Sequence, residues 1–236
     1  MSVLLSLESS SGICSAALHD NGNLLALAEV HIEQAHASRL ALLIDQVVKF
    51  ADVDIKNISA VAVSSGPGSY TGLRIGTSTA KGLCFALGIP LIAVGTLDLL
   101  AEHVRVFNVN GWHLCPMIDA RRMEVYCSLY HANGERLRPV EAKVIDETSF
   151  EQDLAVHPVL FFGTGASKCK NTITHSNAFF LDGINAGAAT LGVIASKKYS
   201  IRDIEDVDTF EPFYLKDFMA KKAVNLIPGI PNKSEV

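Results

Sequence analysis

The stretch SSGPGSYTGLRIGTSTAKGL, residues 64–83, contains four glycines between positions 66 and 76. It follows the β-like run ISAVAVSS (58–65) and precedes an Ala- and Leu-rich run that continues to Leu87. A strand that enters a helix through a glycine-rich turn is typical of α/β folds, and backbone N–H groups at such a helix start can bind an anion. The stretch therefore predicts an α/β protein, and it raises the question of whether the loop holds a phosphate.

The spacing of these glycines matches neither of the common nucleotide-binding motifs. A P-loop needs Lys and then Ser or Thr after its last glycine, whereas Leu73 and Arg74 follow Gly72. A dinucleotide fingerprint has two residues between its second and third glycines, and this loop has three. Two interpretations stay open: an anion-binding loop, or a tight turn whose glycines permit close packing. In the first interpretation the candidate ligands are Gly66, Gly68, Ser69, Tyr70, Thr71, Gly72 and Arg74.

The same order of elements occurs twice along the chain. Residues 3–32 and 113–145 each predict three strands, with an acidic residue after the first strand and an Asn-Gly pair further on. A buried strand with a glycine turn follows in each copy, at 58–68 and 159–165. Two unrelated hairpins would explain each copy separately, but the shared order favours a repeat. We therefore expect two duplicated lobes, residues 1–107 and 108–220, with the helix at 189–200 packing back on the first lobe and a flexible tail at 221–236.

Composition limits the partners that this chain can bind. The net charge is −5, and nucleic-acid binding depends strongly on cationic neutralisation of phosphates, so strong RNA binding by this chain alone is disfavoured. The five cysteines are odd in number and form no C-x-x-C pair, which favours free thiols in a reducing cytoplasm. We find no apolar run of about 18 residues, so we expect no membrane span.

Glu8 and Asp119, the acidic residues that end the first strand of each copy, are candidate metal-binding carboxylates. If the two lobes face each other across a cleft, these side chains could hold Mg²⁺ against the phosphates of a nucleotide. Arg121 and Arg122 directly follow Asp119, so carboxylates paired with nearby arginines are an equally good interpretation. The histidines are dispersed and form no H-E-x-x-H pattern, so we predict no metal site from this chain alone.

Four segments carry a resemblance to a known family. GPGSYTGLRIG (66–76) is similar to the signature of the TsaB family, also called YeaZ. The segments LLSLESSSGICSAAL (4–18), IDARRMEVY (118–126) and EPFYLK (211–216) resemble the family's opening strands, second-lobe motif and C-terminal motif. The resemblance covers roughly residues 3–220. It implies an actin-like, sugar-kinase-like fold of two duplicated lobes, each a mixed sheet with flanking helices.

The resemblance also implies a role. Members of the family support a TsaD-type catalytic paralogue, which transfers a threonylcarbamoyl group to the adenosine beside the anticodon of tRNA, and a TsaE-type ATPase completes the assembly. This chain would then need no cofactor, because ATP, Mg²⁺ and a metal belong to the partner subunits, and it would meet tRNA only indirectly. One departure is Glu8, where the family usually has Asp.

The resemblance further suggests where the partner binds and what chemistry is missing. The metal-binding histidines of the catalytic paralogue correspond to Thr96 and Leu100, neither of which replaces a histidine ligand. Two alternatives remain: a stand-alone ATP-dependent kinase or ATPase that uses the cleft carboxylates, and a glycoprotease-like metallopeptidase. We expect the helix that follows the glycine loop, together with the helix at 35–51, to contact the paralogue or a second copy of the chain. The residues predicted for this interface are Leu73, Gly76, Ala80, Leu83, Leu40, Leu43 and Val47.

Overall fold

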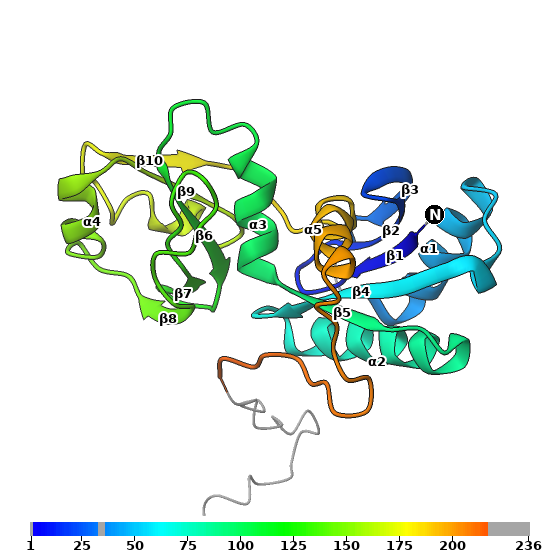
Figure 1. Cartoon of the computed structure of the whole chain (residues 1–236). Helices are drawn as coiled ribbons and strands as arrows, with labels where there is room; N and C mark the ends of the chain where they lie inside the picture. Colours follow the sequence, from blue (N-terminus) through cyan, green and yellow to red (C-terminus); the bar gives the residue numbers. More distant parts are fainter. Residues whose placement is uncertain (1, 33–35, 217–236) are drawn as a thin grey trace, which may run out of the picture.

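Two five-stranded sheets divide the protein into two lobes, seen side by side in Figure 1. The structure is a computed structural model, and it describes residues 2–32 and 36–216. The first sheet has the strand order β3-β2-β1-β4-β5, and the second has the order β10-β9-β6-β7-β8. The flexible tail predicted at 221–236 lies outside the described residues.

The first sheet begins as an antiparallel meander and ends as a parallel pair. Its strands are β1 (Val3–Glu8), β2 (Cys14–Asp20), β3 (Asn23–Val30), β4 (Ile58–Gly66) and β5 (Leu91–Gly95). Strand β1 pairs antiparallel with β2 and parallel with β4, which also pairs parallel with β5. Asn21 and Gly22, with φ of 49° and 84°, form the β2–β3 turn as the Asn-Gly pair predicts.

The second sheet repeats this arrangement. Its strands are β6 (His113–Asp119), β7 (Glu124–Cys127), β8 (Glu141–Val144), β9 (Val159–Phe162) and β10 (Ala178–Leu181). Strands β6, β7 and β8 form the antiparallel meander, and β9 pairs parallel with both β6 and β10. The strand orders of the two sheets therefore correspond one to one, which confirms the predicted duplication.

Helices cover both faces of the first sheet. Helices α1 (His36–Phe50) and α2 (Tyr70–Leu87) pack on one face, and α3 (Thr96–Arg105) and α5 (Ala188–Ser200) pack on the other. The second lobe contains the short helix α4 (Glu151–Val156), and single 3₁₀ turns lie at Ile55–Asn57 and Ser167–Cys169. Helix α2 ends as predicted at Gly88, whose left-handed conformation (φ 66°) is typical of a helix C-terminus.

A single hydrophobic core joins the two lobes. It contains Leu4 and Ala62 of the first sheet, Leu114 and Phe162 of the second, and side chains of α3 and α5. Figure 1 shows α3 and α5 between the two sheets. Because the buried apolar surface is continuous from one sheet to the other, the lobes are packed against each other through these helices.

Helix α5 approaches β2 closely because residue 192 is a glycine. A Cβ atom at Gly192 would overlap the imidazole ring of His19, a fully buried residue of β2. Nε2 of His19 lies 2.9 Å from the carbonyl oxygen of Ala189, and burial lowers the pKa of this histidine. A neutral His19 therefore helps to hold a helix of the second half of the sequence on the first sheet.

An ion-pair network on α3, which Lys197 of α5 joins, makes the stability of the fold dependent on pH. Nε of Arg105 (2.5 Å) and Nζ of Lys197 (2.9 Å) donate to the carboxylate of Glu102, whose side chain is 17% exposed. The hydrogen bond from Arg105 is the main cause that lowers the pKa of Glu102 from 4.5 to about 2, and Lys197 lowers it further. Since the folded-state pKa is depressed, this stabilisation is complete above about pH 4.5 and is lost as the pH falls towards 2.

We therefore expect Glu102→Gln to lower the free energy of unfolding by about 2 kcal/mol at pH 7, with a much smaller difference from the wild type near pH 2.5. Urea unfolding at the two pH values measures this effect. Glu147→Gln, at an exposed position, is the matched control and should change neither value. If Glu102→Gln lowered the free energy of unfolding equally at both pH values, the stabilisation could not be assigned to the ionised carboxylate.

Candidate functional site at the glycine loop and the acidic turns

The glycine loop packs against backbone from two distant segments. A Cβ atom at Gly68 would overlap the carbonyl oxygen of Ser10, and one at Gly72 would overlap that of Ser9. Gly66, at φ 106°, lies where a Cβ atom would be 2.6 Å from the carbonyl oxygen of Phe213. The turn after β1 and the C-terminal segment thus approach the loop from opposite ends of the sequence. These contacts favour the close-packing interpretation for these three glycines.

The hydroxyl and cationic groups predicted for anion binding mostly contact the protein itself. Oγ of Ser69 accepts a hydrogen bond from the backbone N–H of Gly72 (3.3 Å) and acts as the N-cap of α2. The Tyr70 ring lies 4.8 Å from that of Tyr214, and the guanidinium group of Arg74 lies 5.6 Å above the Tyr70 ring. Thr71 is exposed. The start of α2 is therefore capped by Ser69, and Tyr70 packs against side chains of the same chain, while Thr71 and Arg74 are exposed.

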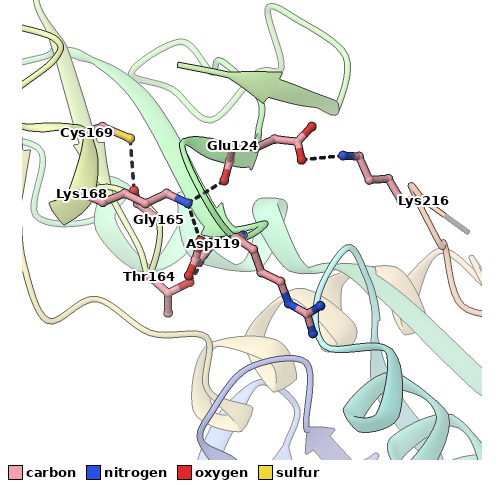
Figure 2. A network of polar contacts seen from close by, with 8 residues as sticks. Asp119, Glu124, Thr164, Gly165, Lys168, Cys169 and Lys216 are labelled. Carbon is pink, nitrogen blue, oxygen red and sulfur yellow. Dashed lines mark hydrogen bonds and ion pairs between the residues drawn. The ribbon is translucent and has the colours of Figure 1, made fainter. Parts of the chain in front are cut away.

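The two acidic turns have different environments. Glu8 is fully buried, and its Oε1 accepts hydrogen bonds from the backbone N–H (2.6 Å) and Oγ (2.5 Å) of Ser10. Asp119 is half-exposed, and its Oδ1 accepts hydrogen bonds from Nζ of Lys168 and from the backbone N–H of Arg121 (2.9 Å). Figure 2 shows Lys168 beside Asp119. Each carboxylate accepts a backbone hydrogen bond from its own turn, and the cation on Asp119 is Lys168, from a distant segment, and not the predicted arginine side chain.

The two positions that the family resemblance aligns with the paralogue's histidines are both buried. Thr96 and Leu100, on α3, are 1% and 2% exposed, and Leu100 packs in the hydrophobic cluster that joins the two sheets. Among the described residues, no group of three or more His, Cys, Asp and Glu side chains could hold a metal ion. Leu100 is therefore enclosed by apolar side chains.

The residues predicted for the partner interface require a correction. Six of the seven are buried within the first lobe: Leu40, Leu43, Val47, Leu73, Gly76 and Ala80; Leu83 is partly buried. The reason is that apolar residues at helical spacing mark the stripe that faces the sheet, which the sequence alone does not distinguish from a stripe that faces a partner. The opposite face of α2 is exposed and carries Arg74, Ser78, Gly82 and Phe85.

The path of residues 205–216, which we call the C-terminal strap, is not among the features predicted from the sequence. Its Phe213 donates a backbone hydrogen bond to the carbonyl oxygen of Ser65 (2.7 Å) beside the glycine loop. Nζ of Lys216 lies 2.5 Å from a carboxylate oxygen of Glu124 on β7. The strap therefore runs from the glycine loop to the second lobe, as the right side of Figure 2 shows for Lys216. The aromatic pair in EPFYLK was the available signal, since such side chains in an irregular segment need a surface to cover.

The sequence is similar to those of known proteins. A family model described as TsaD, tRNA N6-adenosine threonylcarbamoyltransferase, matches residues 30–224. The tRNA threonylcarbamoyladenosine biosynthesis protein TsaB of Bacillus subtilis (strain 168) is 32% identical over 176 residues, which cover 72% of this chain and 74% of that protein. The TsaB protein of Escherichia coli (strain K12) is 28% identical over 236 residues, which cover 96% and 98% of the two chains.

Solved structures of related proteins have a similar fold. YeaZ from Pseudomonas aeruginosa superposes with a TM-score of 0.78 at 27% identity, covering 91% of this chain and 100% of that one. Component A of Acidaminococcus fermentans (R)-2-hydroxyglutaryl-CoA dehydratase, at a TM-score of 0.52 and 10% identity, covers 85% and 100% of the two chains and shares the fold alone. The duplicated lobes are thus those of the actin-like, sugar-kinase-like fold. Three findings, the family-model match, the TsaB relatives and the YeaZ superposition, together show that the chain belongs to the TsaB/YeaZ family.

Proposed function

We propose that this chain is a non-catalytic subunit in the biosynthesis of threonylcarbamoyladenosine in tRNA, which binds and activates a TsaD-type paralogue in the cytoplasm. The observation that carries this proposal is the shared core. Thr96 and Leu100 are buried where the catalytic relative would present metal-binding histidines, and apolar side chains of both lobes surround Leu100. Neither residue supplies the imidazole ligand that the paralogue's histidines would provide, and Leu100 is enclosed by apolar side chains.

The glycine loop supports the same conclusion. Its glycines accommodate Ser9, Ser10 and Phe213 of this chain, and Ser69 caps α2 with its own hydroxyl group. We therefore propose that the chain itself requires no nucleotide or metal, and that ATP, Mg²⁺ and a catalytic metal act on the TsaD-type and TsaE-type partners. The loop then serves to position α2, whose outer face remains accessible.

The exposed face of α2 is the surface that we assign to the paralogue. Arg74, Ser78, Gly82 and Phe85 are three or four residues apart and so lie on one side of the helix. Phe85 is 83% exposed, and the small residues Ser78 and Gly82 would let a partner helix approach the α2 backbone closely. An exposed aromatic residue beside small side chains is typical of a protein interface. The same face could also mediate self-association.

Reconstitution tests the proposed function. Purified TsaD-type and TsaE-type partners, tRNA and the threonylcarbamoyl-donor substrates are combined with and without this chain, and modified adenosine is quantified. We expect omission to lower the yield at least tenfold, because the transferase would lack its activating contact. Full modification without the chain would overturn the proposal. So would turnover of Mg-ATP by the chain alone at an enzymatic rate, measured in the same preparations.

A further inference from the structure

The turn between β6 and β7 is built from residues that its backbone conformation disfavours. Arg121 and Arg122 both have positive φ, 71° and 49°. The β2–β3 turn of the same protein uses Asn21 and Gly22 at φ 49° and 84°, the residue types that tolerate this conformation. A residue with a Cβ atom loses about 1 kcal/mol or more in the left-handed region. Two adjacent arginines in such a turn therefore indicate a function that depends on their side chains.

The groups around this turn fix it in place and leave its two arginines as the uncompensated charges. Lys168 pairs with Asp119 on one side of the turn, and Lys216 of the C-terminal strap pairs with Glu124 on the other. Figure 2 shows both pairs. The backbone N–H of Arg121 is held by Asp119, and within the described ranges 2–32 and 36–216 neither guanidinium group makes a hydrogen bond or an ion pair. Both arginines are exposed, so the turn presents a local charge of +2 to the solvent.

We propose that Arg121 and Arg122 contact the phosphodiester backbone of tRNA within the modification complex. This inference rests on the proposed function, which supplies the polyanion. Guanidinium groups bind phosphate through paired N–H donors, and backbone contacts of this kind position a nucleic acid without reading its sequence. This direct contact departs from the expectation that the chain meets tRNA only indirectly. Because the net charge of the chain is −5, the contact adds to the transferase's own contacts with tRNA and does not replace them.

The shape of the surface distinguishes tRNA from a free nucleotide. Small ligands bind in concave pockets that surround them. Two cavities in the described part of the chain, of about 990 Å³ and 520 Å³, are lined by other residues and by neither Arg121 nor Arg122. An exposed hairpin tip with two cations fits an extended backbone of phosphates better than it fits a nucleoside phosphate.

The double variant Arg121→Asn/Arg122→Gly separates the charge from the turn. It copies the Asn-Gly pair of the β2–β3 turn, so it keeps the backbone conformation while it removes both guanidinium groups. We expect its melting temperature to equal or exceed that of the wild type, because both new residues suit positive φ. The matched control is Arg202→Asn, which removes another exposed arginine with positive φ (58°).

Binding of fluorescently labelled tRNA is measured for the isolated chain at low salt and for the complex with the transferase across a salt series. We expect the double variant to weaken tRNA binding about tenfold and to reduce the slope of log K against log salt by about two, whereas Arg202→Asn changes neither. Unchanged tRNA binding, or an equal loss with Arg202→Asn, would overturn the inference. A loss confined to transferase co-purification or to ATP binding would also overturn it. Failure of the proposed function is distinct, because the wild-type chain would then not stimulate threonylcarbamoyl transfer by the paralogue.

Discussion

Replacing Gly72 with alanine is expected to lower the free energy of unfolding by about 2–3 kcal/mol, the usual range for overpacking a close contact. The added Cβ atom would overlap the carbonyl oxygen of Ser9, which belongs to the backbone and cannot rotate away. The turn after β1 would then have to move away from α2. Urea unfolding measures the change, and the melting temperature should fall by roughly 5–10 °C for a chain of this length.

Gly82→Ala is the matched control in the same helix. Gly82 lies in α2 with no atom within 4 Å of an added Cβ, so alanine meets open space there. Because alanine favours helix over glycine by about 1 kcal/mol, this variant should be slightly more stable than the wild type. If Gly72→Ala lowers the free energy of unfolding and Gly82→Ala raises it, the glycine loop is established as a packing element. An unchanged midpoint for Gly72→Ala would contradict this assignment.

Replacing Gly82 with arginine is expected to abolish stable binding to the TsaD-type paralogue while the chain stays folded. The long charged side chain would project from the exposed face of α2, between Ser78 and Phe85. If a partner packs on this face, it would have to bury the new cation without a matching charge, and a loss of a hundredfold or more in affinity is expected, about 3 kcal/mol. Co-elution on size exclusion and calorimetric titration with the paralogue measure the loss.

Gly82→Ala again serves as the control, since its methyl group should leave binding within a few-fold of the wild type. Gly76→Arg, which the sequence alone would suggest, does not test the interface. A Cβ atom at Gly76 would overlap Oγ of Ser9, so that variant would disturb the fold before it met a partner. Normal binding by a folded Gly82→Arg chain would show that the paralogue uses another surface.

Local sequence patterns determined most of the fold of this protein. The Asn21–Gly22 turn, the end of α2 at Gly88 and the duplicated meander depend on residue conformation and on apolar spacing, which act over a few residues. The resemblance of the glycine-loop motif to the TsaB family was likewise readable from one stretch. These features needed no knowledge of distant contacts.

The tertiary structure decided what each of these patterns is for. The glycines of the loop could have received an anion or a neighbouring backbone, and Ser9, Ser10 and Phe213 fill the space from positions far away in the sequence. The apolar stripe of α2 could have faced a partner or a sheet, and it faces the sheet. Such contacts join segments that no local pattern relates, because side-chain periodicity fixes which residues share a face but not what covers that face. For the same reason the pairing of Lys168 with Asp119 and of Lys216 with Glu124 emerged only once the chain was folded.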